Sequence, residues 1–192
     1  MSAARRPRAD VARNRALLLA AARDAFTSGE PVVLEAVARA AGVGIGTLYR
    51  HFPTREDLAE AVYAAELDAV VEAAPALLAE LPPDRALRAW LQRYTEFVAT
   101  KRGMLQTLRA GWASGRIATP ATRERVTAVL GTFLSAGAAA GTLRGDVDPD
   151  DVTALMLGVF VPSETRSAEQ QDRLLDLVLA AVAVPGPSSS GG

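Results

Sequence analysis

The chain contains no cysteine and a single histidine in 192 residues. The absence of cysteine excludes disulfide bonds and thiolate metal sites, and it fits a reducing compartment such as the cytoplasm. No run of about 18 uncharged apolar residues occurs, so we expect no membrane-spanning helix. With one histidine and no cysteine, the sequence offers no activated nucleophile and no metal site, and it contains no glycine-rich loop of the kind that binds phosphate. We therefore expect no enzyme, no catalytic residue, no bound metal and no cofactor.

Lysine is also scarce, because Lys101 is the only lysine among 21 basic residues. The formal net charge is only −1, but the charge is unevenly distributed along the chain. Residues 1–55 hold nine arginines and four acidic residues, a net charge of +5, which leaves −6 for the remainder. A basic N-terminal segment (residues 1–55, the basic front end) followed by an acidic remainder (the body) favours a polyanionic partner for the N-terminal segment.

The stretch from Val33 to Tyr63 has the pattern of two short helices joined at a glycine and followed by a third helix. In the first helix the apolar residues recur every three or four positions and share one face: Leu34, Val37, Ala38 and Ala41. Gly42 lets the chain leave that helix, because glycine adopts the left-handed conformation at little cost. This arrangement predicts a helix-turn-helix. In its second helix the inner face would carry Val43, Leu48 and Phe52, and the outer face hydroxyls and basic groups suited to phosphates and base edges.

Residues 41–58, AGVGIGTLYRHFPTREDL, resemble the signature of the tetracycline-repressor (TetR) family of transcriptional regulators. The resemblance implies an all-α protein of about nine helices, with an N-terminal three-helix DNA-binding domain and a helical ligand-binding and dimerisation domain. We expect a basic arm without regular structure at 1–8, the DNA-binding domain at 9–53, the regulatory domain at 54–184 and an unstructured tail at 185–192. The arginines of the arm either contact DNA or are inert.

The same resemblance implies a sequence-specific DNA-binding regulator in the cytoplasm, in this family most often a repressor. Its expected partners are a double-stranded DNA operator, a second copy of the chain and an unidentified small-molecule effector that releases the operator. Two alternatives stay open. One is a helical module that binds an acidic protein, and the other is a DNA-binding regulator that needs no ligand.

The candidate DNA-binding residues lie in and around the second helix of the motif. By resemblance Thr47 and Tyr49 match positions that touch DNA, the tyrosine typically at a phosphate, and Arg55 matches a basic phosphate contact. Arg50 and His51 occupy variable positions and are candidates for reading bases or clamping the backbone. The full set is Arg39, Gly44, Thr47, Tyr49, Arg50, His51 and Arg55. Alternatively, Tyr49 is partly buried with its hydroxyl satisfied locally, and His51 covers the core beside Phe52.

Three departures from the family pattern concern the same segment. Val33 stands where threonine commonly opens the first helix of the motif, and it offers no hydroxyl to a phosphate. Gly44 replaces a frequent serine, and Ile45 replaces a frequent polar or basic residue. We therefore expect fewer phosphate contacts than usual in the family.

The rest of the chain predicts further helices with recognisable starts. Thr54 and Asp57 form a capping box, and so do Ser167 and Gln170. Asp148 and Pro149 are typical of a helix start, which explains the aspartates around them better than a calcium loop does. We expect one helix to end near Lys101 to Gly103 and a separate helix to span 104–114. The small-residue segment SAGAAAG, 135–141, indicates either close packing or a cavity lining.

Two features of this body suggest binding. Aromatic residues could line an effector pocket, although each could equally be plain core: Trp90, Tyr94, Phe97, Trp112 and Phe133. The last two helices are apolar around more of their surface than one packed face requires. The resemblance implies that they form a four-helix dimer interface, and the alternative is a helix buried inside a monomer.

Overall fold

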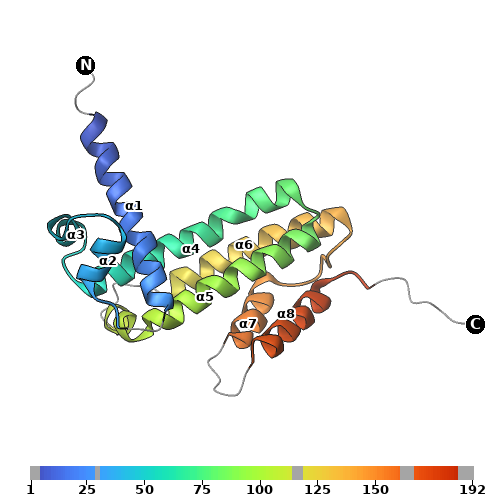
Figure 1. Ribbon diagram of the computed structural model, residues 1–192. Coiled ribbons are helices and arrows are strands. Elements are labelled where there is room, and N and C mark those ends of the chain that lie inside the picture. The colour runs from blue at the N-terminus through green and yellow to red at the C-terminus, as the bar shows by residue number, and fades with distance from the viewer. Residues whose placement is uncertain (1–4, 29–30, 114–118, 161–166, 186–192) are drawn as a thin grey trace, which may run out of the picture. The chain divides into compact units, whose positions relative to one another are not determined.

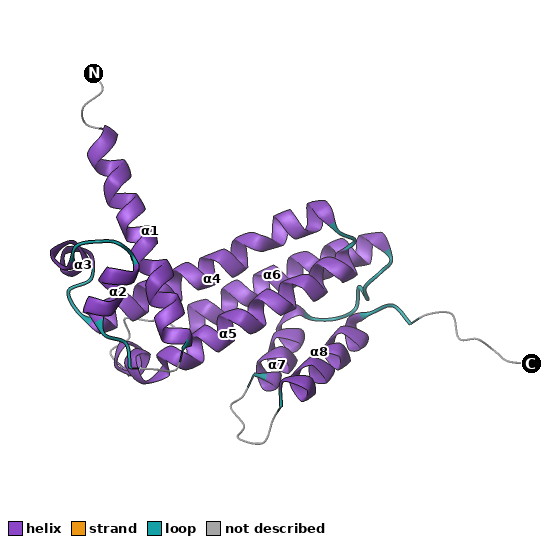
Figure 2. Ribbon diagram, in the orientation of Figure 1, coloured by secondary structure: helices purple, strands orange, loops and turns teal. Residues whose placement is uncertain are grey.

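The computed structural model describes residues 5–28, 31–113, 119–160 and 167–185 (Figure 1). These residues form eight helices and no strand, apart from an isolated β-bridge between Leu143 and Ala183 (Figure 2). The all-α fold class is therefore confirmed. In chain order the helices are α1 (Arg5–Thr27), α2 (Leu34–Ala40), α3 (Ile45–His51), α4 (Arg55–Glu80), α5 (Pro83–Ala113), α6 (Thr119–Ala140), α7 (Pro149–Val159) and α8 (Ala168–Val182).

The chain packs as two compact units. The first comprises Met1–Asp68 and Glu96–Thr119, and the second comprises Ala69–Thr95 and Pro120–Gly192. Helices α4 and α5 each contribute to both units, so α1–α3 share a unit with the first part of α4 and the last part of α5. The boundary expected at residue 53 divides the chain by function and stays a prediction.

The ends of the chain lie largely outside the described residues. Helix α1 begins at Arg5, so the last part of the segment expected to be an arm is helical. Residues 1–4 and 186–192 are not described, and the extent of the arm and tail stays a prediction. None of the described helices combines the length and the apolar character that a membrane crossing needs.

The core of the first unit holds α1, α2 and α3 together. Leu18 and Phe26 of α1, Val37 of α2, Leu48 of α3 and the adjoining Phe52 are each at most 3% exposed. Burying each of these side chains stabilises the fold by roughly 1.5–3 kcal/mol. A small three-helix packing with so few large side chains therefore depends on every one of them.

Helix starts and stops follow the local chemistry that the sequence predicts. Gly42 has a φ of +65°, the left-handed conformation expected after α2. At the start of α4 the Thr54 backbone N–H donates to the Asp57 carboxylate at 3.0 Å, and the Asp57 N–H donates to the Thr54 hydroxyl at 3.1 Å. Asp148 accepts from the Asp150 N–H at the start of α7, and Ser167 accepts from the Gln170 N–H at the start of α8. The left-handed glycine after α2, the Thr54–Asp57 capping box and the helix caps at Asp148 and Ser167 are therefore confirmed.

The helix end expected near Lys101 to Gly103 is wrong, because α5 continues without a break to Ala113. This continuity leaves the described residues one helix short of the expected nine. Gly103 lies where α5 meets the end of α1. A Cβ atom built on it would stand 1.9 Å from the carbonyl oxygen of Phe26. The glycine thus permits two backbones to touch and does not end a helix.

Charged groups line the same junction of α1, α4 and α5. Burial raises the pKa of the Glu66 carboxyl above its ordinary value, and the nearby Arg23 opposes that shift. The Arg23 Nη1 atom lies 3.9 Å from Glu66 Oε1. Burial also lowers the pKa of Lys101, whose Nζ atom lies 5.9 Å from the centre of the Tyr63 ring. The first unit therefore tolerates partly desolvated charge beside its core.

The second unit has an aromatic core. The Trp90 ring lies 5.5 Å from that of Tyr94 and 5.8 Å from that of Phe133, and Tyr94 lies 5.2 Å from Phe160. The indole N–H of Trp90 donates to the Val70 carbonyl at 2.8 Å, so its one buried donor is satisfied. Close ring contacts of this kind are worth about 0.5–1.5 kcal/mol beyond area burial.

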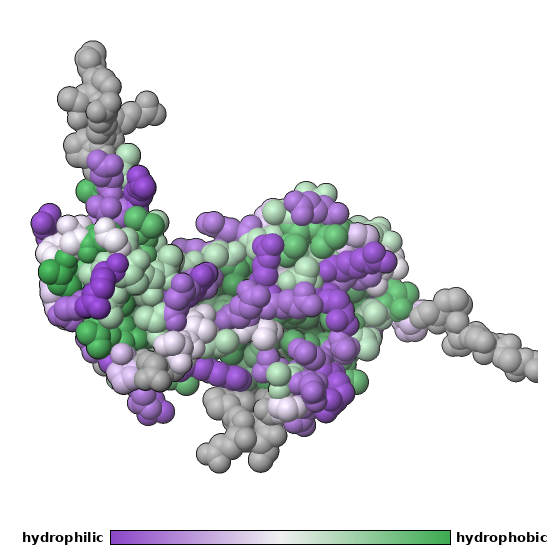
Figure 3. Space-filling model, in the orientation of Figure 1, coloured by the Kyte–Doolittle hydropathy of each residue, from purple (hydrophilic) through white to green (hydrophobic). Residues whose placement is uncertain are grey.

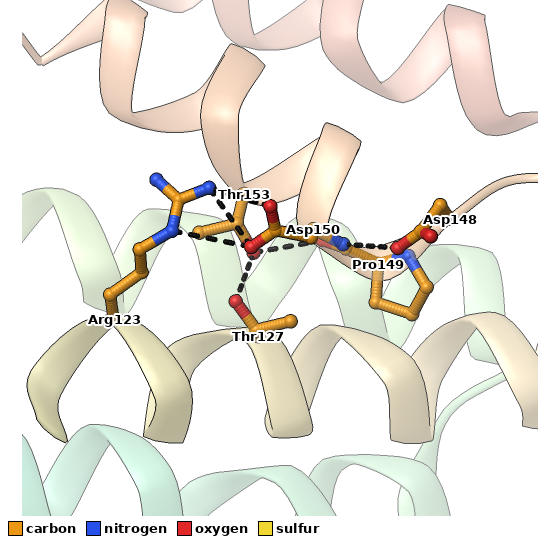
Figure 4. Close-up of polar contacts among 6 residues, drawn as sticks. All are labelled: Arg123, Thr127, Asp148, Pro149, Asp150 and Thr153. Atoms are coloured by element: carbon orange, nitrogen blue, oxygen red, sulfur yellow. Dashed lines mark hydrogen bonds and ion pairs between the residues drawn. The ribbon is translucent and has the colours of Figure 1, made fainter. Parts of the chain in front are cut away.

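Polar side chains fasten α7 to α6 (Figure 4). Arg123 of α6 donates to both carboxylate oxygens of Asp150, each at 2.9 Å. The buried Thr153 shares a hydrogen bond of 2.8 Å with Thr127 and donates to the Pro149 carbonyl. These contacts fix the position of α7, which pairs with α8 as a hairpin.

The small-residue segment at the end of α6 serves close packing. A Cβ atom on Gly137 would lie 2.4 Å from the side chain of Leu143. Leu143 is 2% exposed and pairs with Ala183 in the β-bridge. Of the two interpretations left open for this segment, the structure therefore supports the first.

Candidate nucleic-acid interface

Helices α2 and α3 form a tight helix-turn-helix. The Val43 N–H donates to the Ala38 carbonyl at 2.9 Å, which closes the turn around Gly42. Leu48 is the buried residue of α3 and has no exposed surface. A seven-residue helix held from behind by one leucine leaves most of its circumference on the outside. On the face shown in Figure 3, apolar patches (green) lie between polar side chains (purple) around α1–α3.

The structure places most of the candidate DNA-binding residues at the surface of this motif. Arg39, Gly44, Tyr49 and Arg50 are exposed. The others, Thr47, His51 and Arg55, are half-buried. Their roles stay predictions, but a ligand approaching α3 from outside can reach the exposed group.

Two glycines open the first turn of α3. No atom lies within 4 Å of the position that a Cβ atom would take on Gly44. A Cβ atom on Gly46 would lie 4.0 Å from a terminal nitrogen of Arg50, so this guanidinium extends over the bare backbone. Gly44 is the N-cap residue of α3 and offers no side-chain cap. The backbone N–H groups there remain accessible to an outside acceptor.

Tyr49 is 43% exposed, and its hydroxyl donates to Glu35 Oε1 at 3.3 Å. The hydroxyl is thus satisfied locally, as one interpretation held, while the ring stays at the surface. Glu35 lies in the first turn of α2 and is itself exposed. Sequence reasoning missed this carboxylate, because the two residues are 14 positions apart and meet only when α2 and α3 pack.

Basic and aromatic groups meet at the end of α3. The His51 ring lies 6.0 Å from that of Phe52, so the histidine partly covers the core while remaining half-exposed. The Arg15 guanidinium of α1 lies 5.7 Å from the centre of the Phe52 ring. Sequence reasoning did not select Arg15, although its position in the basic front end is a signal. A cation beside a helix C-terminus is also favoured by the helix dipole.

Arg55 opens α4 directly after the capping residue Thr54. Its Nε atom is buried and finds no hydrogen-bond partner in the described part of the chain. Arg55 also takes part in no ion pair between described residues, and the same is true of Arg39 and Arg50. Guanidinium groups left without an internal carboxylate can bind an external anion.

The candidate effector residues are only partly brought together. Trp90, Tyr94 and Phe133 lie in the second unit, and each is at most 3% exposed. The Trp90 ring contacts both of the other rings. Phe97 lies in the first unit, with its ring 5.6 Å from that of Tyr63. The side chain of Trp112 lies outside what the structure describes. The second unit thus offers a cluster of three of these five residues.

Among the described residues no group of three or more histidine, cysteine, aspartate or glutamate side chains could hold a metal ion. The second unit does present an exposed apolar surface on the α7–α8 hairpin. Leu155 is 55% exposed and Leu177 is 65% exposed. They border a groove lined also by Gly158, Val159, Leu174, Val178 and Ala181.

Family models match both parts of the chain. Residues 18–62 match the model described as bacterial regulatory proteins, tetR family. Residues 82–183 match the model described as the C-terminal domain of SbtR-like transcriptional regulators. No curated protein matches the chain.

Solved structures give the same picture. A TetR transcriptional regulator from Streptomyces coelicolor is 42% identical, with a TM-score of 0.77 over 91% of this chain and 99% of the other. A TetR transcription regulatory protein from Mycobacterium vanbaalenii is 33% identical, with a TM-score of 0.73 over 92% and 99% of the two chains. A structure described as a gamma-butyrolactone receptor is 25% identical, with a TM-score of 0.54 over 92% and 90%.

Proposed function

The chain belongs to the TetR family of bacterial transcriptional regulators, and on that premise we propose that α3 enters the major groove of a DNA operator. The observation that supports this most strongly is the outer face of α3. There Tyr49 and Arg50 stand beside the bare backbone of Gly44 and Gly46, and the buried Leu48 holds the helix from behind. A short, basic and sterically open helix fits the width of that groove.

Different side chains of this face would serve different purposes. Arg50 can pair bidentately with guanine, a contact worth about 1–3 kcal/mol of discrimination. Thr47, Tyr49 and Arg55 would contact phosphates, which set the register of the protein on the duplex but carry no sequence information. His51 and Arg39 would extend the contact along the backbone. Gly44, which lacks a side chain, would let a phosphate approach the first turn of α3.

We propose further that the protein acts as a homodimer. The apolar groove of the α7–α8 hairpin would pack against its own copy about a twofold axis, which covers Leu155 and Leu177. Each copy then contributes one DNA-binding domain, here called a head. Two heads related by the twofold axis can read two half-sites about one helical turn apart. The dimer would act in the cytoplasm, where its operator lies.

The second unit would bind a small-molecule effector that releases the operator, so that the protein is a repressor. The aromatic cluster of Trp90, Tyr94 and Phe133 is the candidate site. One solved relative is described as a gamma-butyrolactone receptor, and this description supports effector binding on this fold. The effector must favour one spacing of the heads over the other, because a ligand with equal affinity for both states shifts nothing.

Selection of bound fragments from random duplexes tests the proposed function. We expect an enriched sequence with two related half-sites. Each phosphate contact should add about 0.9 to the slope of log affinity against log salt. The double variant Thr47→Ala with Tyr49→Ala should lose this binding while keeping the unfolding midpoint of the natural protein. A helical module that binds an acidic protein would enrich no duplex and would be unaffected by the double variant.

A further inference from the structure

Glu35 places a negative charge on the face that would meet DNA. Its carboxylate is exposed in the first turn of α2, and its Oε1 atom lies 3.3 Å from the Tyr49 hydroxyl on α3. Every phosphate repels a carboxylate at this position, and so do the N7 and O6 acceptors of guanine. A residue that weakens binding to any polyanion needs a compensating contact.

The contact between the two side chains rests on a single proton. A tyrosine hydroxyl has one O–H donor, and an ionised carboxylate can only accept. The Tyr49 hydroxyl can therefore donate to Glu35 or to a phosphate, but not to both. When Tyr49 turns to a phosphate, Glu35 loses its donor in an interface full of acceptors.

We propose that Glu35 is a specificity-determining residue that accepts a hydrogen bond from the exocyclic amino group of a cytosine or an adenine in the major groove. The inference rests on the proposed function, because it requires α3 to lie in that groove. A base with an amino group replaces the donor that Tyr49 withdraws. The tyrosine–phosphate contact is then fully available only at a site with the correct base.

The chemistry of the groove selects the base. The major groove offers two amino donors, N4 of cytosine and N6 of adenine, and glutamate is a known type of acceptor for the first. Thymine presents a carbonyl and a methyl group there, and guanine presents two acceptors. Glu35 thus disfavours guanine and thymine at one position in each half-site and lowers affinity for unrelated DNA.

A purely structural role is the competing explanation. An acidic residue in the first turn of a helix interacts favourably with the helix dipole, and a link from α2 to α3 could simply stiffen the motif. Both effects would change stability, and neither would change the preference for one base. Base preference therefore separates the two explanations.

The first test compares Glu35→Gln with the natural protein in selection from random duplexes. Asp24→Asn is the matched control, since it removes one negative charge from an exposed carboxylate of the same unit that pairs with Arg23 of α1. We expect Glu35→Gln to bind non-operator DNA roughly tenfold more tightly and to lose a tenfold discrimination against guanine and thymine at one position per half-site, because its amide N–H groups can donate to the acceptors of those bases. Asp24→Asn should keep the natural preference.

The second test is a double-mutant cycle with Glu35→Ala and Tyr49→Phe on the selected operator. In the natural protein, binding must first break the Tyr49–Glu35 hydrogen bond. Tyr49→Phe should therefore reduce affinity less in the natural protein than in the Glu35→Ala background, by at least about threefold. The thermal midpoints of all four proteins verify that the comparison is between folded heads.

Two results would overturn the inference: an unchanged sequence preference in Glu35→Gln, or equal effects of Tyr49→Phe in both backgrounds. Either result leaves the proposed function standing, provided that the natural protein selects an operator. If the natural protein selects no duplex at all, the proposed function itself fails.

Discussion

The two compact units use their charged side chains differently. In the second unit arginines are paired with carboxylates that lie far away in sequence, as in Arg88 with Asp176 and Arg123 with Asp150. On α2 and α3, by contrast, Arg39 and Arg50 face solvent with no ion pair among the described residues. The second unit uses charge to fasten helices to one another. Helices α2 and α3 of the first unit keep charge accessible to an outside partner.

The largest expected effect concerns the backbone contact between α5 and α1 in the first unit, which depends on a glycine. Gly103→Ala should destabilise the first unit by about 3 kcal/mol or more, because its Cβ atom would overlap the Phe26 carbonyl and backbone must move. Gly131→Ala in α6 is the control, since its Cβ atom would lie 3.4 Å from Pro149. We expect that change to be neutral or to stabilise by up to about 1 kcal/mol. Denaturant unfolding measures both, and equal effects would refute the close contact.

The next prediction concerns the exposed apolar surface of the second unit. Leu177→Glu should raise the dimer dissociation constant at least 100-fold, equivalent to about 2.7 kcal/mol, because two carboxylates would be buried about the twofold axis. Leu17→Glu on α1, where the leucine is 41% exposed, is the matched control and should remain dimeric. Light scattering across a dilution series distinguishes them. A Leu177→Glu protein that stays dimeric would place the interface elsewhere.

A smaller effect tests the polar fastening of α7. Thr153→Val should cost about 1–2 kcal/mol of unfolding free energy, since it leaves the partly buried Thr127 hydroxyl without its partner. Thr127→Val together with Thr153→Val should cost less than the two single changes combined, because replacing both partners removes the unsatisfied group. Unfolding of all four proteins in denaturant gives the coupling. Strict additivity would show that the hydroxyls do not interact.

The smallest effect concerns charge beside the core of the first unit. Burial raises the pKa of Glu66, so protonation favours the folded state, and this contribution is lost as pH rises through the raised pKa. Glu66→Gln should therefore stabilise the protein at neutral pH by less than about 1 kcal/mol, since pairing with Arg23 offsets part of the penalty. The difference should vanish below the ordinary carboxyl pKa. Unfolding at several pH values tests this, and a stability difference between Glu66→Gln and the natural protein that does not change with pH would contradict it.

Features that depend on neighbours in sequence could be predicted. The glycine turn at Gly42 and the capping box of Thr54 and Asp57 were predictable because their partners lie within a few residues. The outward placement of Tyr49 and Arg50 followed from the spacing around Leu48. Local chemistry thus determines the outline of the helix-turn-helix.

Features that depend on tertiary packing could not be predicted. Gly103 has the local appearance of a helix end, and only the approach of Phe26 shows why glycine stands there. The Tyr49–Glu35 hydrogen bond likewise joins two helices. The spacing of apolar residues within each helix does not reveal how the two helices are placed relative to each other. The candidate effector residues look alike in sequence, yet Phe97 lies in the first unit, where it packs with Tyr63, and not with the cluster around Trp90 in the second unit.

The most direct test of the account is the operator affinity of Arg50→Ala beside that of Arg85→Ala. Both changes remove one exposed arginine, the first from α3 and the second from the start of α5 in the second unit. We expect Arg50→Ala to weaken operator binding about 10- to 100-fold and Arg85→Ala to leave it unchanged. Equal affinities for the two variants would contradict the assignment of α3 as the DNA-reading helix.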